Sequence, residues 1–377
     1  MKKTALIPWL VFLVLLQSCS IQSFKQNLQA DPSLQGFHEK VDAMVIQKMN
    51  EYNIPGLSIG LIHYDSIIYT KGYGIRSIKN NSLVTENTVF HTASISKLFT
   101  AMAIMKLVEQ RKLSLEDTLT SLLPKLKYTD NRINNITIKQ LLNHTSGLRD
   151  IGNYHWGNNN RFDTSLEEFV LQHHLKLDAN PSSTYQYNNL GYDILGHVIE
   201  KISFSTFDDF LKDNILAPSG MDNSDFRYFK IPDSLKTSPH SKRWITKHVY
   251  ERKTYPYTRE HAPSSTLNSS SKDLSKWMIS FMHNVNNLED NKGYRQMISP
   301  TFKPNERIGL GFQLGSIMSQ KTISHYGGDK GFRSYLLMIP EKRIGLVLLA
   351  NCDYNEHFRQ EIVHPIAKFL LTRYGLH

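Results

Sequence analysis

Apolar and polar positions follow two different rhythms along this chain, one at its ends and another in its middle. Near the start, apolar residues recur at three- and four-residue spacing through Val41, Met44, Val45 and Met49, which predicts an amphipathic helix beginning near Gly36. Strand patterns bounded by turn residues follow this helix and return near the end of the chain. They predict strands at 57–63, 66–73, 311–317, 322–326, 334–339 and 344–349, and a closing helix from about 356 to 374.

The middle of the chain carries helical patterns instead. These fall at 97–107, 138–142, 165–173, 192–202 and 274–283. Strands at both ends around a helix-rich middle predict an α+β fold, in which an antiparallel β-sheet flanked by helices receives an inserted, mainly helical subdomain. We expect one domain over 36–377, with a sheet lobe at about 36–115 and 262–377 and a helical lobe at about 116–261.

The first twenty residues are typical of an export signal. Lys2 and Lys3 precede an apolar run over 6–16, which is too short to span a membrane but suits the core of a signal peptide. The run ends in Leu16-Gln17-Ser18-Cys19, which resembles a bacterial lipobox. It predicts a signal peptide at 1–18, lipidation of Cys19, and a polar tether over 19–35. An ordinary cleaved signal or an N-terminal anchor is the alternative.

The export signal changes how the net charge and the cysteine content of the chain are interpreted. The chain has 377 residues, 40% of them hydrophobic and 21% charged, so it can bury a large core. Its net charge of +10 would suit a polyanion, but Lys2 and Lys3 leave with the signal peptide. We expect a lipoprotein held on a membrane, on the periplasmic or the outer-membrane and cell-surface side, with no nucleic-acid partner. Cys352 is the only thiol besides Cys19, and we expect it to be buried and inert.

Positive charge is densest in the segment 236–259. Its basic residues stand against the single carboxylate of Glu251, and four aromatic residues are interleaved with them. The basic residues are Lys236, Lys242, Arg243, Lys247, Arg252, Lys253 and Arg259. We interpret the segment as solvated and irregular, with contact to an anionic cell-wall polymer as the alternative.

Ser94 and Lys97 stand three residues apart at the start of an apolar helix pattern. At this spacing on a helix the two side chains share a face, so the amine can reach the hydroxyl. A lysine desolvated by apolar neighbours loses part of its charge and becomes a base that can activate a serine nucleophile. A second Ser-x-x-Lys at 269–272 is explained by helix capping, and capping is also the alternative for Ser94.

Tyr187 and Asn189 form the only Tyr-x-Asn in the chain. A tyrosine beside a cationic lysine can have its pKa lowered and shuttle a proton. The asparagine amide offers a donor and an acceptor to Lys97 or to a substrate amide. The alternative is a loop tyrosine that packs its ring beside an asparagine that makes a turn.

His325-Tyr326-Gly327-Gly328 stands at the end of a predicted strand. Glycines there let a substrate backbone approach closely, and a free strand amide can bind an oxyanion. His325 adds polarity or, when protonated, positive charge near a substrate carboxylate. A surface histidine is the alternative, and His155-Trp156-Gly157 has the same spacing in an Asn-rich loop.

In this order the three motifs resemble the serine β-lactamase and penicillin-binding-protein superfamily, most closely its class C β-lactamase-related serine hydrolase branch. Tyr187 follows Ser94 by 93 residues, and His325 follows Tyr187 by 138. Stretches at 138–148, 187–196, 218–221, 271–277 and 309–312 are also similar to that branch. The resemblance implies a β-lactamase/transpeptidase-like catalytic domain over 36–377.

The resemblance further implies an acyl-enzyme cycle without a cofactor. Ser94 would attack a carbonyl, Lys97 and Tyr187 would share base duty, and Asn189 would hold Lys97 and the substrate amide. The backbone amides of Ser94 and Gly328 would form the oxyanion hole. Scattered histidines show no metal-ligand spacing, so we expect no metal.

The motif departs from the superfamily's dedicated β-lactamases, which usually carry Lys where this chain has His325. A neutral histidine attracts a carboxylate less strongly, and Arg333 could supply the charge, although a solvent-facing strand arginine is the simpler interpretation. We therefore expect a serine hydrolase of the DD-peptidase, D-amino-acid amidase or esterase type, acting on a small molecule or peptide of possible peptidoglycan origin. The alternatives are a weak β-lactamase and a non-catalytic penicillin- or muropeptide-binding protein.

Overall fold

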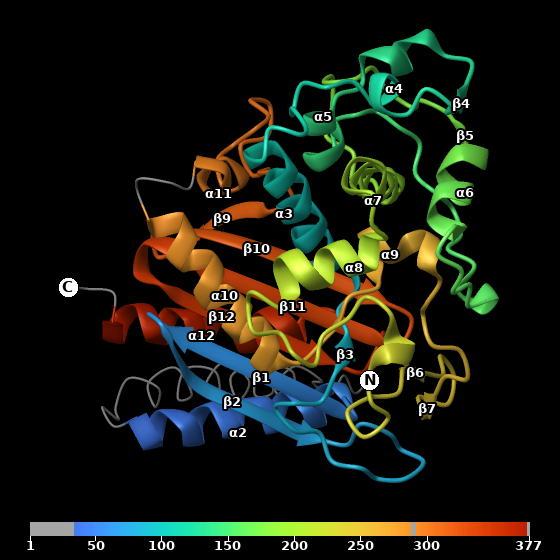
Figure 1. Cartoon of the computed structure of the whole chain (residues 1–377). Coiled ribbons are helices and arrows are strands. Elements are labelled where there is room, and N and C mark those ends of the chain that lie inside the picture. Colours follow the sequence, from blue (N-terminus) through green and yellow to red (C-terminus); the bar gives the residue numbers. More distant parts are fainter. Residues whose placement is uncertain (1–33, 288–291, 375–377) are drawn as a thin grey trace, which may run out of the picture.

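Both ends of the chain build one six-stranded antiparallel sheet, in the order β2-β1-β12-β11-β10-β9 (Figure 1). The computed structural model describes residues 34–287 and 292–374. The strands are β1 (Gly56–His63), β2 (Ser66–Gly74), β9 (Gln313–Ile317), β10 (Gln320–Asp329), β11 (Phe332–Ile339) and β12 (Ile344–Ala350). β12 lies between the N-terminal hairpin and β11, with Ala350 opposite Leu57 on one side and Arg333 on the other. The chain ends are therefore joined through the middle of the sheet.

Helices cover the sheet on both faces because its central strands are apolar on both. β12 is buried along its whole length, and its alternate residues enter two separate hydrophobic clusters. Leu346 and Leu348 pack with α2 (Leu34–Tyr52) and α12 (Phe358–Tyr374). On the other face, Val347 and Leu349 join the larger cluster with α3 (Ser96–Glu109), α10 (Ser271–Asn286) and α11 (Lys292–Met297).

The segment between the two halves of the sheet forms a mainly helical lobe beyond α3 (Figure 1). Its helices are α4 (Leu119–Leu122), α5 (Ile138–Leu142), α6 (Ser165–Gln172), α7 (Leu190–Ser203) and α8 (Phe207–Leu211), and α9 (Ala262–Ser265) leads back to the sheet. The short strand pairs are β3 (Phe90–His91) with β8 (Asn268–Ser269), β4 (Lys127–Tyr128) with β5 (His174–Leu175), and β6 (His240–Lys242) with β7 (Val249–Glu251). The expected α+β fold is confirmed.

The structure differs from the sequence expectations in three local places. The strand expected from Gly311 begins at Gln313, because Gly311 turns the backbone with φ +85°. The His325 motif lies within β10 and not at its end, since the strand continues to Asp329. The basic segment expected to be irregular contains the β6–β7 hairpin.

The expected signal peptide at 1–18, Cys19 and most of the tether at 19–35 lie outside the described residues. Among the helices that the structure describes, none has both the length and the hydropathy that crossing a bilayer requires. Cys352 is fully buried, as expected, and burial raises the pKa of its thiol to about 12. That thiol is therefore protonated and unreactive at neutral pH.

Candidate active site

Ser94 lies in a 3₁₀ turn, η1 (Ala93–Ile95), directly before α3 and not inside the helix. Hydrogen bonds hold both sides of this turn. Thr92 donates its N–H to the Leu267 carbonyl at 2.8 Å, and its own carbonyl accepts from Ser334 Oγ at 2.7 Å. Ala93 has φ +50°, which is strained for a residue with a Cβ and is typical of functional sites. The turn presents Ser94 partly exposed, while its neighbours are buried.

Lys97 places its amine beside Ser94, as the three-residue spacing predicts. Its Nζ donates to Ser94 Oγ at 3.2 Å and to the Ser264 carbonyl at 2.7 Å. The side chain is fully buried, and this burial lowers the pKa of Lys97 to about 7, although nearby carboxylates oppose the shift. At neutral pH a large share of Lys97 is therefore the free amine, which can accept the Ser94 proton.

Tyr187 faces the same pair from the loop before α7. Its hydroxyl is hydrogen-bonded to Ser94, and Lys97 Nζ lies 5.0 Å from its ring centroid. The expected lowering of the Tyr187 pKa is wrong. Burial raises that pKa and the charge of Asp150 adds to the rise, while the hydrogen bond with Ser94 opposes it. Tyr187 therefore stays a phenol, suited to relay a proton and not to act as a standing base.

His144 fixes the backbone that carries Tyr187, and the sequence analysis did not single it out. It lies just after α5 with φ +59°. Its Nδ1 accepts the Asn188 N–H at 3.1 Å, its carbonyl accepts the Gln186 N–H at 2.8 Å, and its ring packs 4.4 Å from that of Tyr187. Burial lowers the pKa of His144 far below its usual range, so the ring is neutral and its remaining proton is on Nε2.

Asn189 does not hold Lys97, which corrects the expected role. Its Nδ2 donates to Asp150 Oδ2 at 2.8 Å, and Asp150 Oδ1 accepts the backbone N–H groups of Asn189 and Leu190. The carboxylate thus caps the N-terminus of α7, where the helix dipole favours negative charge. Among the described residues, Lys97 Nζ donates to Ser94 and Ser264, and no hydrogen bond joins it to Asn189.

A buried hydrogen bond between an aspartate and a histidine lies close to Lys97. Asp193 of α7 accepts from His261 Nδ1 at 2.7 Å, and both side chains are buried. Asp193 is also hydrogen-bonded to the side chain of Ser264, the residue whose carbonyl binds Lys97. Asp193 is the largest of the charges that raise the pKa of Lys97 against the effect of burial.

β10 forms the wall opposite Tyr187. His325 is buried, its ring centroid lies 6.3 Å from that of Tyr187, and its Nδ1 is 2.7 Å from the Tyr326 carbonyl. Burial lowers the pKa of His325 to about 3, so this ring is neutral. β9 pairs with β10 only as far as Ser324, which leaves the edge from His325 to Asp329 without a strand partner.

The two glycines of β10 differ in their surroundings. A Cβ at Gly327 would stand 2.1 Å from Ser334 Oγ and 2.2 Å from the Thr92 carbonyl, so only glycine lets the strand lie against the Ser94 turn. A Cβ at Gly328 would meet only the Arg333 side chain, at 3.4 Å. Gly328 is exposed and lies on the unpaired edge, where its amide is suited to an oxyanion.

A shallow recess opens between these two walls. Its lining residues are Leu142, His144, Tyr185, Tyr187, Ile308, Gly309, Gly311, Phe312, Gln313 and His325. The lining side chains are apolar or uncharged, and Lys97 Nζ lies 5.0 Å from the ring centroid of Tyr187. The site therefore joins a serine, a lysine near its titration midpoint and a tyrosine, with a glycine-edged strand on the far side.

A family model described as Beta-lactamase matches residues 41–370. The chain belongs to the Beta-lactamase family. This family consists generally of serine hydrolases, and the antiparallel sheet with its helical lobe is the β-lactamase/transpeptidase arrangement.

Two curated relatives are 25% identical to this chain over the aligned residues. The protein Flp of Staphylococcus aureus strain MW2 is 25% identical over 340 residues, which cover 86% of this chain and 66% of Flp. The unguisins hydrolase ungD' of Aspergillus campestris is 25% identical over 356 residues, covering 89% of this chain and 64% of the relative. The chain thus spans slightly less than two thirds of the length of either relative.

Two solved structures have a similar fold. The octameric penicillin-binding protein homologue from Pyrococcus abyssi has a TM-score of 0.74 and 26% identity, covering 89% of this chain and 77% of its own. The β-lactamase/D-alanine carboxypeptidase from Pseudomonas syringae has a TM-score of 0.71 and 20% identity, covering 87% and 97%. The second likeness shows the fold alone.

Within this Beta-lactamase domain, the competing motifs have structural explanations. Ser270 caps α10 by accepting the Asp273 N–H at 3.1 Å, and Ser269 is buried against Ser224 at 2.8 Å. The second Ser-x-x-Lys is therefore a helix start, as expected. His155 lies in the loop before α6, at a left-handed position with φ +50°.

Arg333 does not supply a free positive charge to the β10 wall. Its guanidinium donates to the carbonyls of Asp329, Phe332 and Asp353 and pairs with Glu356 at 3.2 Å. The expectation of a solvent-facing strand arginine is also wrong, because these backbone carbonyls hold the side chain against the sheet.

Proposed function

We propose that this protein is an exported, lipid-anchored serine hydrolase that cleaves an amide or ester bond through a Ser94 acyl-enzyme. One observation carries the catalytic part of the proposal: the buried Lys97 amine lies 3.2 Å from Ser94 Oγ with its pKa lowered to about 7. Such a lysine can take the serine proton at neutral pH, and it is in place before any substrate binds.

The acylation step follows from these positions. Ser94 Oγ attacks the carbonyl carbon while Lys97 Nζ accepts its proton, and the oxyanion is held by the amides of Ser94 and Gly328. Tyr187, still protonated, passes a proton to the leaving amine or alkoxide and is reprotonated from Lys97. Water then attacks the carbonyl carbon of the Ser94 acyl-enzyme ester, with the proton transfers of acylation running in reverse. This step releases the acid product and restores Ser94.

The neutral β10 wall bears on the substrate class. His325 is uncharged at neutral pH, and Arg333 is engaged with backbone carbonyls and Glu356. A substrate carboxylate would therefore find no charged histidine at this strand edge, and the Arg333 guanidinium beside Gly328 is already paired with Glu356. This favours esters and amides that lack a free carboxylate at that position, as in an esterase or D-amino-acid amidase, over a DD-peptidase or a weak β-lactamase.

The named relatives support hydrolysis without fixing the substrate. One is called a hydrolase of unguisins, and one structural neighbour is called a β-lactamase/D-alanine carboxypeptidase. Export and lipid attachment rest on Lys2, Lys3 and the Leu16–Cys19 sequence.

A labelling experiment tests the nucleophile. The protein is treated with a fluorescent phosphonate, beside Ser94→Ala and the matched variant Ser269→Ala from the second Ser-x-x-Lys. We expect labelling to disappear in Ser94→Ala and to persist in Ser269→Ala. The opposite result would overturn the assignment.

A substrate panel then separates the activities. It contains p-nitrophenyl esters, D-aminoacyl p-nitroanilides, nitrocefin and a D-Ala-D-Ala peptide. We expect turnover of the first two classes to exceed that of the last two, which carry the carboxylate. Fastest turnover of nitrocefin would contradict the substrate argument, and stable labelling with no turnover would favour a non-catalytic binding protein.

A separate experiment tests the lipid anchor. A Cys19→Ser protein that still incorporates labelled fatty acid would refute lipidation of Cys19.

A further inference from the structure

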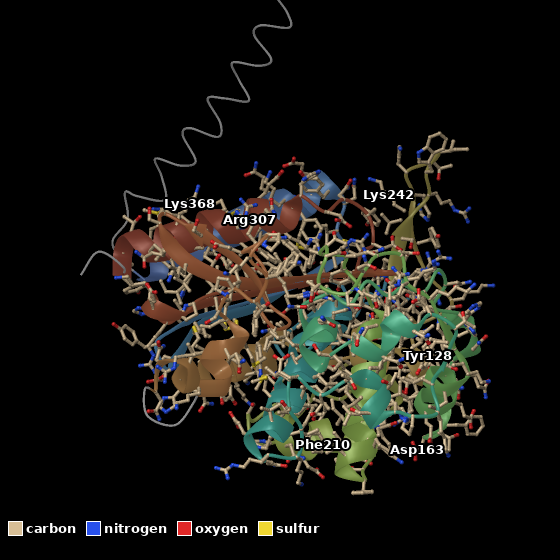
Figure 2. All side chains as sticks on the ribbon, turned by 90° about the horizontal axis from the view of Figure 1, so that it is seen from above. Tyr128, Asp163, Phe210, Lys242, Arg307 and Lys368 are labelled. Atoms are coloured by element: carbon tan, nitrogen blue, oxygen red, sulfur yellow. The ribbon has the colours of Figure 1, made fainter. Side chains whose placement is uncertain are left out.

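The turn of the β6–β7 hairpin exposes two large apolar side chains side by side. Trp244 is 84% exposed and Ile245 is 82% exposed. Figure 2 shows Lys242 where this hairpin leaves the body of the molecule, on the opposite side from Phe210. An exposed apolar pair at the end of a projecting element is costly in water and typical of an interaction site.

Positive charge surrounds this apolar pair. Lys242, Arg243 and Lys247 flank it, and none of the three forms an ion pair with a carboxylate of the described residues. Their partners are aromatic rings: Arg243 lies 5.4 Å from the Tyr250 ring centroid, and Lys247 lies 5.9 Å from that of Trp244. The cationic groups thus remain free to face an anionic surface.

The base of the hairpin is fixed, so its tip has a defined position. Ser241 Oγ is hydrogen-bonded to Asp353 at 2.5 Å and accepts from Arg252 at 2.8 Å. Asp353 also accepts the N–H of Gly331 at 2.9 Å, in the turn between β10 and β11. The hairpin is therefore tied to the end of β10 that carries the site glycines.

We propose that the β6–β7 tip, residues 242–248, docks on an anionic lipid surface. Trp244 and Ile245 would enter the headgroup region, and the surrounding cations would pair with lipid phosphates. A soluble polyanion would leave the apolar pair in water, and a second copy of this chain would meet the same positive charge. A lipid surface satisfies both features at once.

Docking at this position has a consequence for the site. It would hold the end of β10 with Gly327 and Gly328 close to the lipid surface, in addition to any attachment through the N-terminus. The inference stands on the hairpin alone and does not depend on the reaction at Ser94.

Fluorescence quenching of Trp244 tests the proposal with the full chain. The protein is added to vesicles of phosphatidylcholine with or without phosphatidylglycerol, containing a nitroxide-labelled lipid. We expect emission to be quenched in the anionic vesicles, and this quenching to be lost in Trp244→Phe. In a variant with Lys242→Gln, Arg243→Gln and Lys247→Gln, half-maximal quenching should need about fivefold more anionic lipid for each cation removed.

A matched control excludes quenching through the N-terminus alone. Phe204, 93% exposed at the end of α7, is changed to Trp in the Trp244→Phe background, and we expect this residue to stay accessible to aqueous iodide. Equal lipid quenching at both positions would overturn the proposal. The proposal would also be overturned if Trp244 stayed accessible to iodide on anionic vesicles. This would include the case in which the basic residues bind a soluble polyphosphate instead of lipid.

Discussion

In the proposed mechanism, Lys97 sets the pH at which Ser94 can be activated, because a protonated amine cannot accept the serine proton. Its pKa is the balance between burial, which lowers it, and the charges of Asp193, Asp150 and Asp329, which raise it. The value of about 7 places this balance at physiological pH.

The first prediction concerns the pH dependence of acylation. Below pH 7 Lys97 is protonated and inactive as a base, so kcat/KM should rise as pH increases through about 7 and level off above it. Lys97→Arg, which stays charged, should lose about 10²–10⁴-fold of the rate across the whole range. The rise in kcat/KM is measured with a p-nitrophenyl ester as substrate. A rise in kcat/KM centred near pH 10 would contradict a buried lysine that is half neutral at pH 7.

The second prediction concerns Asp193, which we regard as a positioning residue that acts through Lys97. Asp193→Asn removes the largest charge that favours protonated Lys97, so the acidic limb of kcat/KM should move to lower pH. Asp178→Asn, which removes a carboxylate paired with Arg149 on the surface, is the matched control and should leave the limb in place. If the acidic limb of kcat/KM did not shift in Asp193→Asn while the free energy of unfolding stayed unchanged, the positioning role of Asp193 would be contradicted.

At the scale of elements, the site depends on how closely β10 approaches the turn before α3. Gly327 lies against the Thr92 carbonyl, and Ser334 of β11 donates to that same carbonyl. The strand pair therefore holds the turn that presents Ser94. This contact joins residues more than two hundred positions apart in the chain.

Gly327→Ala tests this contact. The added Cβ would clash with a backbone carbonyl, so we expect a loss of about 1–3 kcal/mol in the free energy of unfolding and slower phosphonate labelling of Ser94. Gly328→Ala is the control for stability, since its Cβ meets only a side chain at ordinary contact distance. Urea unfolding measures the free energy of unfolding of both variants. Equal losses in the two variants would show that Gly327 is not required for the close approach of β10 to the Ser94 turn.

At the scale of the whole molecule, buried charges join the helical lobe to the segment that returns to the sheet. Arg259, almost fully buried before α9, donates to Asp208 of α8 at 2.8 Å and to Glu200 of α7 at 2.7 Å. Its Nη1 also donates to the Asp163 carbonyl at 2.6 Å. One guanidinium thus fixes three parts of the lobe around α9, whose Ser264 binds Lys97.

Removing this guanidinium should loosen the lobe. Arg259→Met leaves Asp208 buried without its partner, so we expect a loss of about 3–5 kcal/mol in the free energy of unfolding. Arg149→Met, which breaks the exposed pair with Asp178, should cost about 0–1 kcal/mol. Chemical denaturation measures both; similar costs would mean that the buried network contributes no more than a surface pair.

The local sequence pattern predicted the strands of the main sheet and the longer helices, and it placed Lys97 beside Ser94. Helices and strands follow from apolar spacing, which is a local property, so the N-terminal hairpin and the helix at 138–142 appear where the pattern predicts them. The spacing of Ser94 and Lys97 likewise fixes their proximity within one turn. The second Ser-x-x-Lys was recognisable as a cap from its neighbours alone.

Tertiary structure decided everything that depends on contacts between distant segments. Asn189 donates a hydrogen bond to Asp150 and Arg333 donates to backbone carbonyls, because packing sets the hydrogen-bond partners. Packing also buries Tyr187, and this burial raises its pKa. The same holds for His144 and Asp193, whose importance comes from what they touch. A pKa and a hydrogen-bond partner are properties of the folded surroundings, and no local pattern of residue types specifies them.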